Sequence, residues 1–252
     1  MIHFFNKKLG ETPLEAVERL RDRDSELRDL PMTYAGRLDP LAEGVLLILS
    51  GADCKMKEKY SEFDKEYEVS VLFGVKTDSY DLLGMPEVLV GEHDNGHMVE
   101  RAQTLEIKKY EGTFEQDYPP FSSKTVGGKP LHELARNGKL PAIMPKKEVN
   151  IYFIEKKGET AINGKELLLH IKEVAGSVKG DFRQPEIVAK WTEVLRGKES
   201  VIFPIISIKV KCSSGTYMRS LAQNMGKDAD LGALAFSIVR TRIFTVEGEV
   251  LR

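Results

Sequence analysis

Cysteine is scarce in this chain, whose 252 residues include only Cys54 and Cys212. No Cys-x-x-Cys spacing occurs, so the sequence predicts neither a disulfide framework nor a cysteine-based zinc site. We interpret both cysteines as small core residues of a protein in a reducing compartment. A chain of this length buries enough apolar surface to fold without such cross-links.

Long apolar runs are absent as well. The longest uninterrupted one extends from Val45 to Leu49, whereas a membrane-spanning helix needs about 20 such residues. The apolar opening over residues 1–5 is too short to be the core of a signal peptide. We therefore expect a cytoplasmic protein with no membrane partner.

A strong overall charge is the third missing feature. The chain has 37 Lys and Arg against 39 Asp and Glu, a net charge of -2, which excludes a uniformly basic binder of the histone type. The charges are nevertheless segregated, with ten acids and three bases in residues 78–117, one acid and six bases in residues 118–147, and two acids and six bases in residues 207–245. Such basic stretches form either a polyanion-binding surface or ordinary solvated faces, and charge alone favours the second interpretation.

Capping signals and hydrophobic periodicity predict a mixture of helices and strands. Thr12, Pro13 and Glu15 have the pattern of a capping box that starts a surface helix. Alternating apolar residues over 67–73 predict a half-buried strand that ends at Gly74. Because no strand-helix unit repeats, we predict an α+β fold with a mixed, mainly antiparallel central sheet flanked by helices. The same signals predict further strands at 45–49, 149–154, 166–171, 205–211 and 243–251, and helices beginning at residues 130, 185 and 215.

One stretch carries the strongest indication of chemistry, Gly36-Arg37-Leu38-Asp39-Pro40-Leu41-Ala42-Glu43-Gly44. Pro40 keeps Asp39 out of helical geometry, and the stretch runs directly into the apolar residues 45–49. The carboxylate of Asp39 is thus presented at the end of a buried strand, where it is costly to desolvate unless it is paired or used. An Asp-Pro pair is also common in turns, so the residues alone leave a catalytic and a structural interpretation open.

This stretch resembles the signature of the TruB family of RNA pseudouridine synthases, in which Leu-Asp-Pro precedes Gly-Val-Leu. Other parts of the chain are similar to further motifs of the family, in the family's order. They are residues 5–12, 65–68 with 73–78, 118–124 with 128–136, 212–222 and 240–242.

The resemblance implies a pseudouridine synthase catalytic fold and roles for three residues. Asp39 would be the nucleophile that attacks the target nucleotide, Arg219 the arginine that pairs with this carboxylate, and Tyr67 the tyrosine that stacks on the flipped base. The uracil is detached from C1′, rotated and reattached through C5, so neither a metal nor an organic cofactor is implied. An aspartate is charged at neutral pH, and a guanidinium nearby favours that form.

The resemblance also implies an RNA partner whose target base leaves its stack. At the position where the family has a histidine this chain has Tyr34, which can still stack. Arg37 is a second departure, because it resembles the arginine of the related RluA and RsuA families that enters the RNA in place of the flipped base. The predicted RNA-binding residues are Tyr34, Arg37, Lys65, Lys124, Lys129, Arg136, Arg240 and Arg242.

We expect one catalytic domain to occupy residues 1–252. Residues 118–147, called the covering segment below, would be the mobile basic part that covers the RNA, and residues 156–200 would be an insertion of unknown role. We expect no C-terminal PUA domain of the kind that many relatives have, and no obligatory protein partner is implied. A metal site at His93 and His97 is not expected, because the residues between them are turn-like.

Three functional hypotheses follow. The first is isomerisation of the T-loop uridine of tRNA, with the T-arm as partner. The second is the same reaction on another RNA, suggested by Arg37, the missing histidine and the missing C-terminal domain. The third is a non-catalytic RNA-binding or folding factor, which the combination of Asp39, Tyr67 and Arg219 disfavours.

Overall fold

The computed structural model describes residues 1–89, 95–245 and 250–251. Within these residues a nine-stranded sheet has the order β1-β3-β12-β4-β11-β10-β7, with β2 beside β3 and β13 beside β12. The described pairs are antiparallel except for β12 and β3, which run parallel. This arrangement confirms the predicted α+β class. The strands are β1 (Ile2–Lys7), β2 (Met32–Ala35), β3 (Ala42–Ser50), β4 (Asp64–Phe73), β7 (Gly112–Asp117), β10 (Lys146–Asn163), β11 (Ile202–Cys212), β12 (Ala233–Phe244) and β13 (Val250–Leu251).

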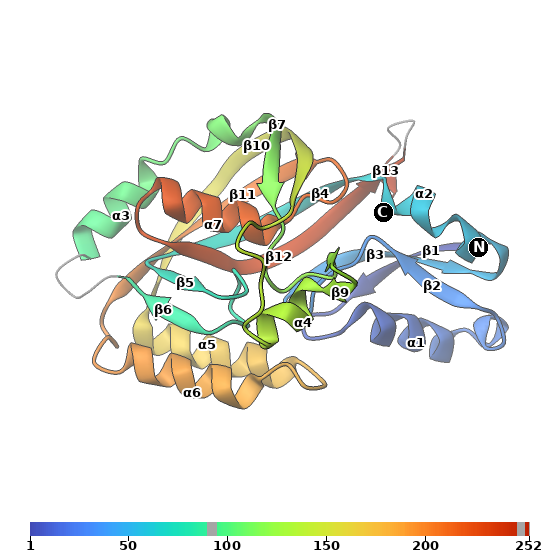
Figure 1. Cartoon of the computed structure of the whole chain (residues 1–252), viewed down its shortest axis with the longest axis horizontal. Helices are drawn as coiled ribbons and strands as arrows, with labels where there is room; N and C mark the ends of the chain where they lie inside the picture. The colour runs from blue at the N-terminus through green and yellow to red at the C-terminus, as the bar shows by residue number, and fades with distance from the viewer. Residues whose placement is uncertain (90–94, 246–249, 252) are drawn as a thin grey trace.

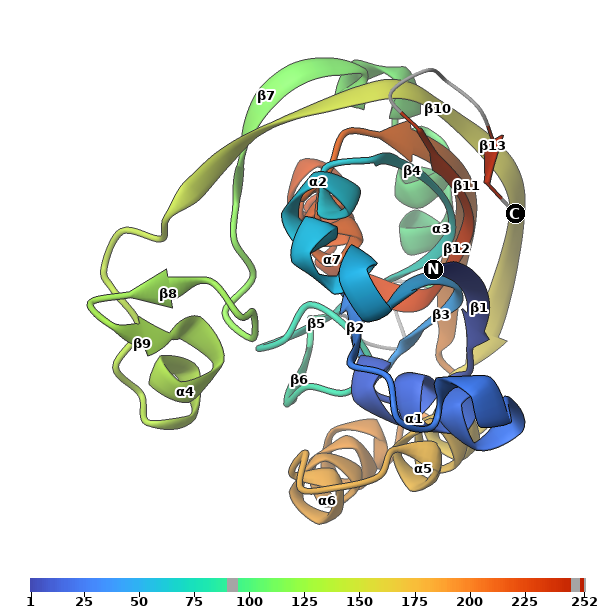
Figure 2. The same ribbon diagram turned by 90° about the vertical axis from the view of Figure 1, so that its right-hand side faces the viewer.

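Helices lie on both sides of this curved sheet, as Figures 1 and 2 show. In Figure 2 the sheet curves around α3 and α7, while α5 and α6 pack against each other near α1. The helices are α1 (Pro13–Arg23), α2 (Lys57–Ser61), α3 (Asn95–Gln103), α4 (Leu131–Arg136), α5 (Gly164–Ser177), α6 (Gln184–Leu195) and α7 (Met218–Asp228). Two small hairpins, β5 (Val75–Thr77) with β6 (Pro86–Val88) and β8 (Thr125–Val126) with β9 (Lys129–Pro130), complete the described sheets.

The predicted capping box is present at the start of α1. The Thr12 side chain accepts a hydrogen bond from the Glu15 backbone, and the Glu15 side chain accepts one from the Thr12 backbone. Helices predicted at residues 130, 185 and 215 correspond to α4, α6 and α7. These signals are local, so they locate helix starts without tertiary information.

The strand predicted at residues 166–171 is wrong, because this segment belongs to α5. Leu167, Ile171 and Val174 recur at helical spacing on its buried face, and the Asn163 side chain caps the helix by accepting from the Glu166 backbone at 2.9 Å. A short apolar run cannot by itself distinguish a strand from a buried helix. The last strand was also predicted too late, since β12 already begins at Ala233; residues 246–249 of the predicted range lie outside the described residues.

The Asp39 loop, residues 36–41, joins β2 to β3. Gly44, with φ +102, lies in β3 where a Cβ would be 2.3 Å from the Arg240 carbonyl oxygen of β12. Only glycine permits this close approach. Immediately after Asp39, the Pro40 carbonyl accepts from the Gly10 amide at 2.9 Å. The loop is therefore fixed by backbone contacts.

The covering segment is built differently from the sheet. It contains the β8–β9 hairpin and α4, which project away from the body of the molecule in Figure 2. Its tip is exposed, and Ile143 has 85% of its surface accessible.

Among the described residues we find no helix of the length and apolarity that crossing a membrane requires.

Candidate active site

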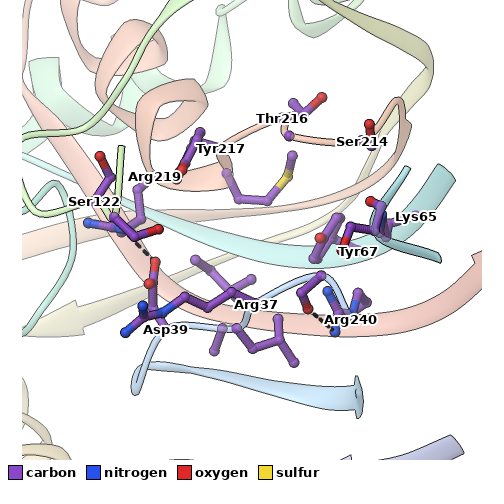
Figure 3. Close-up of a pocket in the computed structure, with 18 of the residues that line it drawn as sticks. Arg37, Asp39, Lys65, Tyr67, Ser122, Ser214, Thr216, Tyr217, Arg219 and Arg240 are labelled. Carbon is purple, nitrogen blue, oxygen red and sulfur yellow. Dashed lines mark hydrogen bonds and ion pairs between the residues drawn. The ribbon is translucent and has the colours of Figure 1, made fainter. Parts of the chain in front are cut away.

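A cavity of about 840 Å³ opens beside the Asp39 loop. Its walls come from that loop, the start of β4, the turn before α7 and β12, which are distant in the sequence. Figure 3 shows side chains from these elements facing the same space. The cavity is lined by residues that include Tyr34, Arg37, Asp39, Lys65, Tyr67, Lys147, Tyr217, Arg219 and Arg240.

Asp39 and Arg219 form an ion pair at one end of this cavity. The distance from Asp39 Oδ2 to Arg219 Nη2 is 2.6 Å, and the Asp39 side chain is 30% exposed while that of Arg219 is 3% exposed. The carboxylate therefore faces the cavity from a fixed position, and the buried Arg219 guanidinium neutralises its charge. The predicted pairing of these two residues is present, and a charge-assisted hydrogen bond of this kind is stronger than a neutral one.

Arg219 is fixed by further partners. Its guanidinium donates to the carbonyl oxygens of Ser79 at 2.8 Å and Phe121 at 3.0 Å. Its Nε lies 3.7 Å from Oδ2 of the buried Asp81. Burial alone would lower the pKa of Arg219, but the Asp39 and Asp81 carboxylates outweigh it and raise that pKa. Arg219 is thus a permanent, immobile cation behind Asp39.

Tyr67 lies in β4, the central strand, and forms part of the cavity wall. It is 8% exposed. Burial raises the pKa of its hydroxyl, so the phenol stays protonated and neutral at physiological pH. Its position in the same cavity as Asp39 agrees with the predicted stacking role, which no contact in the structure tests.

Arg240 is buried, in contrast to its predicted role as an RNA contact. It is 1% exposed, and its guanidinium donates to the carbonyl oxygens of Val45 at 2.6 Å and Gly36 at 2.9 Å. These bonds tie the Asp39 loop to β12. Arg240 thus supports the loop that carries Asp39, and its side chain also lines the cavity. RNA binding by Arg240 stays a prediction.

Lys65 is buried as well, at 4% exposure. Its Nζ donates to the Ser61 carbonyl oxygen at 2.6 Å. Burial, followed by the nearby Arg240 charge, lowers the pKa of Lys65 to about 7. The cavity thus contains a lysine that is only partly charged at neutral pH, which weakens the case for Lys65 as a simple phosphate contact.

The remaining predicted RNA-binding residues lie nearer the surface. Tyr34 and Arg37 line the main cavity, and the Lys57 ammonium is 5.0 Å from the centroid of the Tyr34 ring. Arg242 lies 3.6 Å from Glu66. These contacts leave RNA binding by the three residues a prediction.

The covering segment contributes the three other predicted cations. Lys124 lies 5.2 Å from the centroid of the Tyr118 ring, Lys129 is exposed near Glu133, and Arg136 donates to the Asp181 carbonyl oxygen at 2.9 Å. Lys124 and Lys129 do not line the main cavity. Binding of the RNA chain by these three cations stays a prediction.

Sequence reasoning missed several residues of the site. Asp81, Lys147 and Tyr217 were not singled out, although Lys147 and Tyr217 line the main cavity. A second cavity of about 260 Å³ shares Asp39 and Arg219 and is also lined by Phe182 and Arg183. Asp81 follows the motif at 73–78 by three residues and Tyr217 lies within the motif at 212–222, which is the signal that was available. No local signal places residues 182–183 beside Asp39.

The structure shows no candidate metal centre in its described part, where no group of three or more His, Cys, Asp and Glu side chains is arranged to hold an ion. No metal site was expected at His93 and His97, and His93 lies outside the described residues. The absence of a cofactor remains a prediction.

Comparison with known proteins places these observations in a family. Residues 28–179 match the model of the family described as "TruB family pseudouridylate synthase (N terminal domain)". The proteins named tRNA pseudouridine synthase B from Bacteroides thetaiotaomicron and Parabacteroides distasonis are each 30% identical to this chain, covering 98% and 96% of it and 86% and 85% of their own lengths.

A solved structure described as a Cbf5-Nop10-Gar1 complex supports the fold alone. Its matching chain is 16% identical with a TM-score of 0.52, covering 96% of this chain. Our chain spans about half of that longer chain, 48% of its length. The similarity confirms that the curved sheet and its helices form a known arrangement.

Proposed function

The chain belongs to the TruB family of pseudouridine synthases, and on that premise we propose that it isomerises the T-loop uridine of tRNA, with Asp39 as nucleophile. The observation that carries this proposal is the Asp39–Arg219 ion pair of 2.6 Å in the wall of a cavity. The curated relatives bear the name tRNA pseudouridine synthase B over nearly the whole of this chain, which supports tRNA as the substrate.

The cavity suits a single nucleotide. Its volume of about 840 Å³ lies within the range of about 300–1,000 Å³ for small-molecule sites. A base that leaves its stack costs a few kcal/mol, and stacking on an aromatic side chain returns about 1–3 kcal/mol. Of the tyrosines that line the cavity, Tyr67 is buried while Tyr34 and Tyr217 are half-buried, and Tyr67 is our choice for that stacking.

The proposed reaction requires no external reactant. The bond from C1′ to N1 of the uracil breaks and one from C1′ to C5 forms, while C5 loses a proton and N1 gains one. Asp39 attacks the target nucleotide, the bond that it forms breaks again before the product leaves, and Arg219 orients the carboxylate through its 2.6 Å contact. The atom count and oxidation state of the nucleotide are unchanged, so the reaction consumes no second reactant.

The covering segment and the T-arm belong to the same proposal. With six bases and one acid, residues 118–147 provide positive charge next to the cavity for the RNA chain. Ser122 and Ser123 of the segment line the same cavity as Asp39. We propose that the segment closes over the T-arm and that residues 1–252 form one catalytic domain. The cytoplasmic location inferred from the sequence remains a prediction.

The direct test is pseudouridine formation by Asp39→Asn on an unmodified tRNA transcript and on its isolated T-arm. The variant keeps the size of the side chain but removes the charge, so we expect RNA binding to persist and turnover to fall below detection. Undiminished turnover by Asp39→Asn would exclude Asp39 as the nucleophile.

A second substrate is favoured by one specific observation. Arg37 is exposed and lines both cavities, where it can enter the RNA in place of the flipped base. Mapping pseudouridines in total RNA from cells with and without the gene separates the two substrates. Loss of the modification at a site outside tRNA alone would favour the second.

A further inference from the structure

The loop that joins α5 to α6 reaches the catalytic pair from a distant part of the chain. It follows α5, which ends at Ser177, and precedes α6, which begins at Gln184. Phe182 and Arg183 of this loop line the second cavity together with Asp39 and Arg219. The segment whose role was unknown from the sequence therefore forms part of the surroundings of the active site.

The loop has a fixed conformation. The Gln184 side chain donates to the carbonyl oxygens of Val178 at 3.0 Å and Gly180 at 2.8 Å, and it accepts from the Phe182 amide at 2.9 Å. Arg183 itself has φ 62 and ψ 25, a left-handed conformation that is unfavourable for residues other than glycine. An arginine kept in such a conformation, with its loop tied down around it, points to a role for its side chain.

The Arg183 side chain joins two separate segments. Its Nη1 lies 2.9 Å from Asp78 Oδ2, and its guanidinium carbon lies 4.4 Å from the centroid of the Phe121 ring. Only 24% of the side chain is exposed. A planar guanidinium is suited to both contacts at once, since it pairs with a carboxylate and stacks on an aromatic face.

The turn at Asp78–Ser79 and the segment that contains Phe121 also bind Arg219. The carbonyl oxygen of Ser79, the residue after Asp78, accepts from Arg219 Nη1, and the carbonyl oxygen of Phe121 accepts from Nη2. Nη2 is also the atom 2.6 Å from Asp39. Any shift between the two segments therefore moves the guanidinium that orients the nucleophile.

We propose that Arg183 is a positioning residue for the reaction. It keeps the Asp78–Ser79 turn and Phe121 in a fixed relative position, so that Arg219 stays in contact with Asp39. This proposal rests on the function proposed above. Arg183 touches neither Asp39 nor Arg219 through any hydrogen bond or ion pair found within the described residues, so its effect is transmitted through the two backbone carbonyls.

The test uses Arg183→Gly and Arg183→Lys in the full chain. Glycine accepts the left-handed conformation, so this variant removes the side chain and keeps the loop. Lysine keeps the charge opposite Asp78 but not the flat face over Phe121. Lys179→Met is the matched control, because it removes an exposed cation from the same loop.

We measure the single-turnover rate at saturating tRNA transcript and, separately, the dissociation constant of the transcript. For Arg183→Gly we expect the rate to fall about 10- to 100-fold, the scale of a misplaced catalytic group, with the dissociation constant unchanged within about twofold. The rate of Arg183→Lys is expected to lie between those of Arg183→Gly and the parent chain. The rate of Lys179→Met is expected to equal that of the parent chain. A weakened affinity with an unchanged rate would make Arg183 an RNA contact and overturn the proposal, as would an unchanged rate and affinity.

A second measurement does not depend on activity. Rotation of the Arg219 guanidinium, followed by ¹⁵N NMR without RNA, is expected to be slow in the parent chain and faster in Arg183→Gly. Unchanged rotation would contradict the positioning role even if turnover fell. A parent chain that forms no pseudouridine on any RNA, with the rotation result as expected, would refute the proposed function and leave the positioning of Arg219 intact.

Discussion

The cations of this protein lie in two regions that differ in burial and in partners. At the base of the main cavity Lys65, Arg219 and Arg240 are each less than 5% exposed and donate to backbone carbonyls. In the covering segment Lys124, Lys129 and Arg136 are exposed. The difference teaches that net charge along the chain does not define function, because burial decides whether a cation orients other groups or attracts RNA from solution.

The largest effect that distinguishes the two regions is expected from Arg219→Met. The variant removes the charge beside Asp39 and leaves the volume largely filled. We expect the single-turnover rate to fall about 100- to 1,000-fold, as for loss of one donor in a preorganised site, with little change in RNA affinity. Rapid-quench assays with saturating transcript, together with filter binding, measure the two quantities. Equal losses in rate and affinity would make Arg219 an ordinary RNA contact.

The covering segment is expected to show the opposite pattern. Neutralising Lys124, Lys129 and Arg136 together to glutamine should weaken RNA binding about 10- to 100-fold and reduce the slope of log affinity against log salt by about 2 to 3, since each phosphate contact contributes about 0.7 to 0.9. The rate at saturating RNA should change little. Titrations at several salt concentrations check both quantities.

Three exposed cations that do not line the main cavity offer a charge-matched control for that experiment. Lys165, Lys172 and Arg196 are exposed at α5 and just after α6, so their triple replacement by glutamine removes the same charge away from the cavity. If this control lost as much affinity and slope, general electrostatic attraction, and not the covering segment, would bind the RNA.

The smallest effect concerns the stability cost of a buried cation. The pKa of Lys65 falls from 10.5 to about 7, so between these values the unfolded chain binds more protons than the folded one and the unfolding free energy rises with pH. Lys65→Met removes this dependence. Its stability relative to the parent should be greatest below pH 7 and should decline by about 1 kcal/mol between pH 6 and pH 8.

Denaturant titrations of the two proteins at pH 6, 7 and 8 measure this difference. A constant difference across the range would show that Lys65 is not desolvated as its burial indicates.

Much of the fold was predictable from short-range patterns. The capping box at Thr12 and the alternation over residues 67–73 act within a few residues, and the structure contains α1 and β4 at those places. The strand prediction at 166–171 was wrong because the apolar run is too short to reveal its period. The segment forms a helix that packs against α6.

The candidate site divides in the same way. Asp39 was identified because Pro40, the flanking glycines and the following apolar run are all local. Its pairing with Arg219 was expected only from resemblance to a family, since no local pattern joins a loop before β3 to the start of α7. The structure supplies the distance of 2.6 Å and shows that Arg240, expected to bind RNA, is buried.

The sequence by itself determined which side chains carry charge, where the chain turns and which segments alternate in polarity, because these properties depend on neighbouring residues. The tertiary structure alone decided that Arg219 lies behind Asp39, that Arg240 is a support and that Arg183 joins Asp78 to Phe121. Those outcomes depend on which distant segments pack together and on how much water each cation loses, and desolvation and Coulomb attraction are set by that packing.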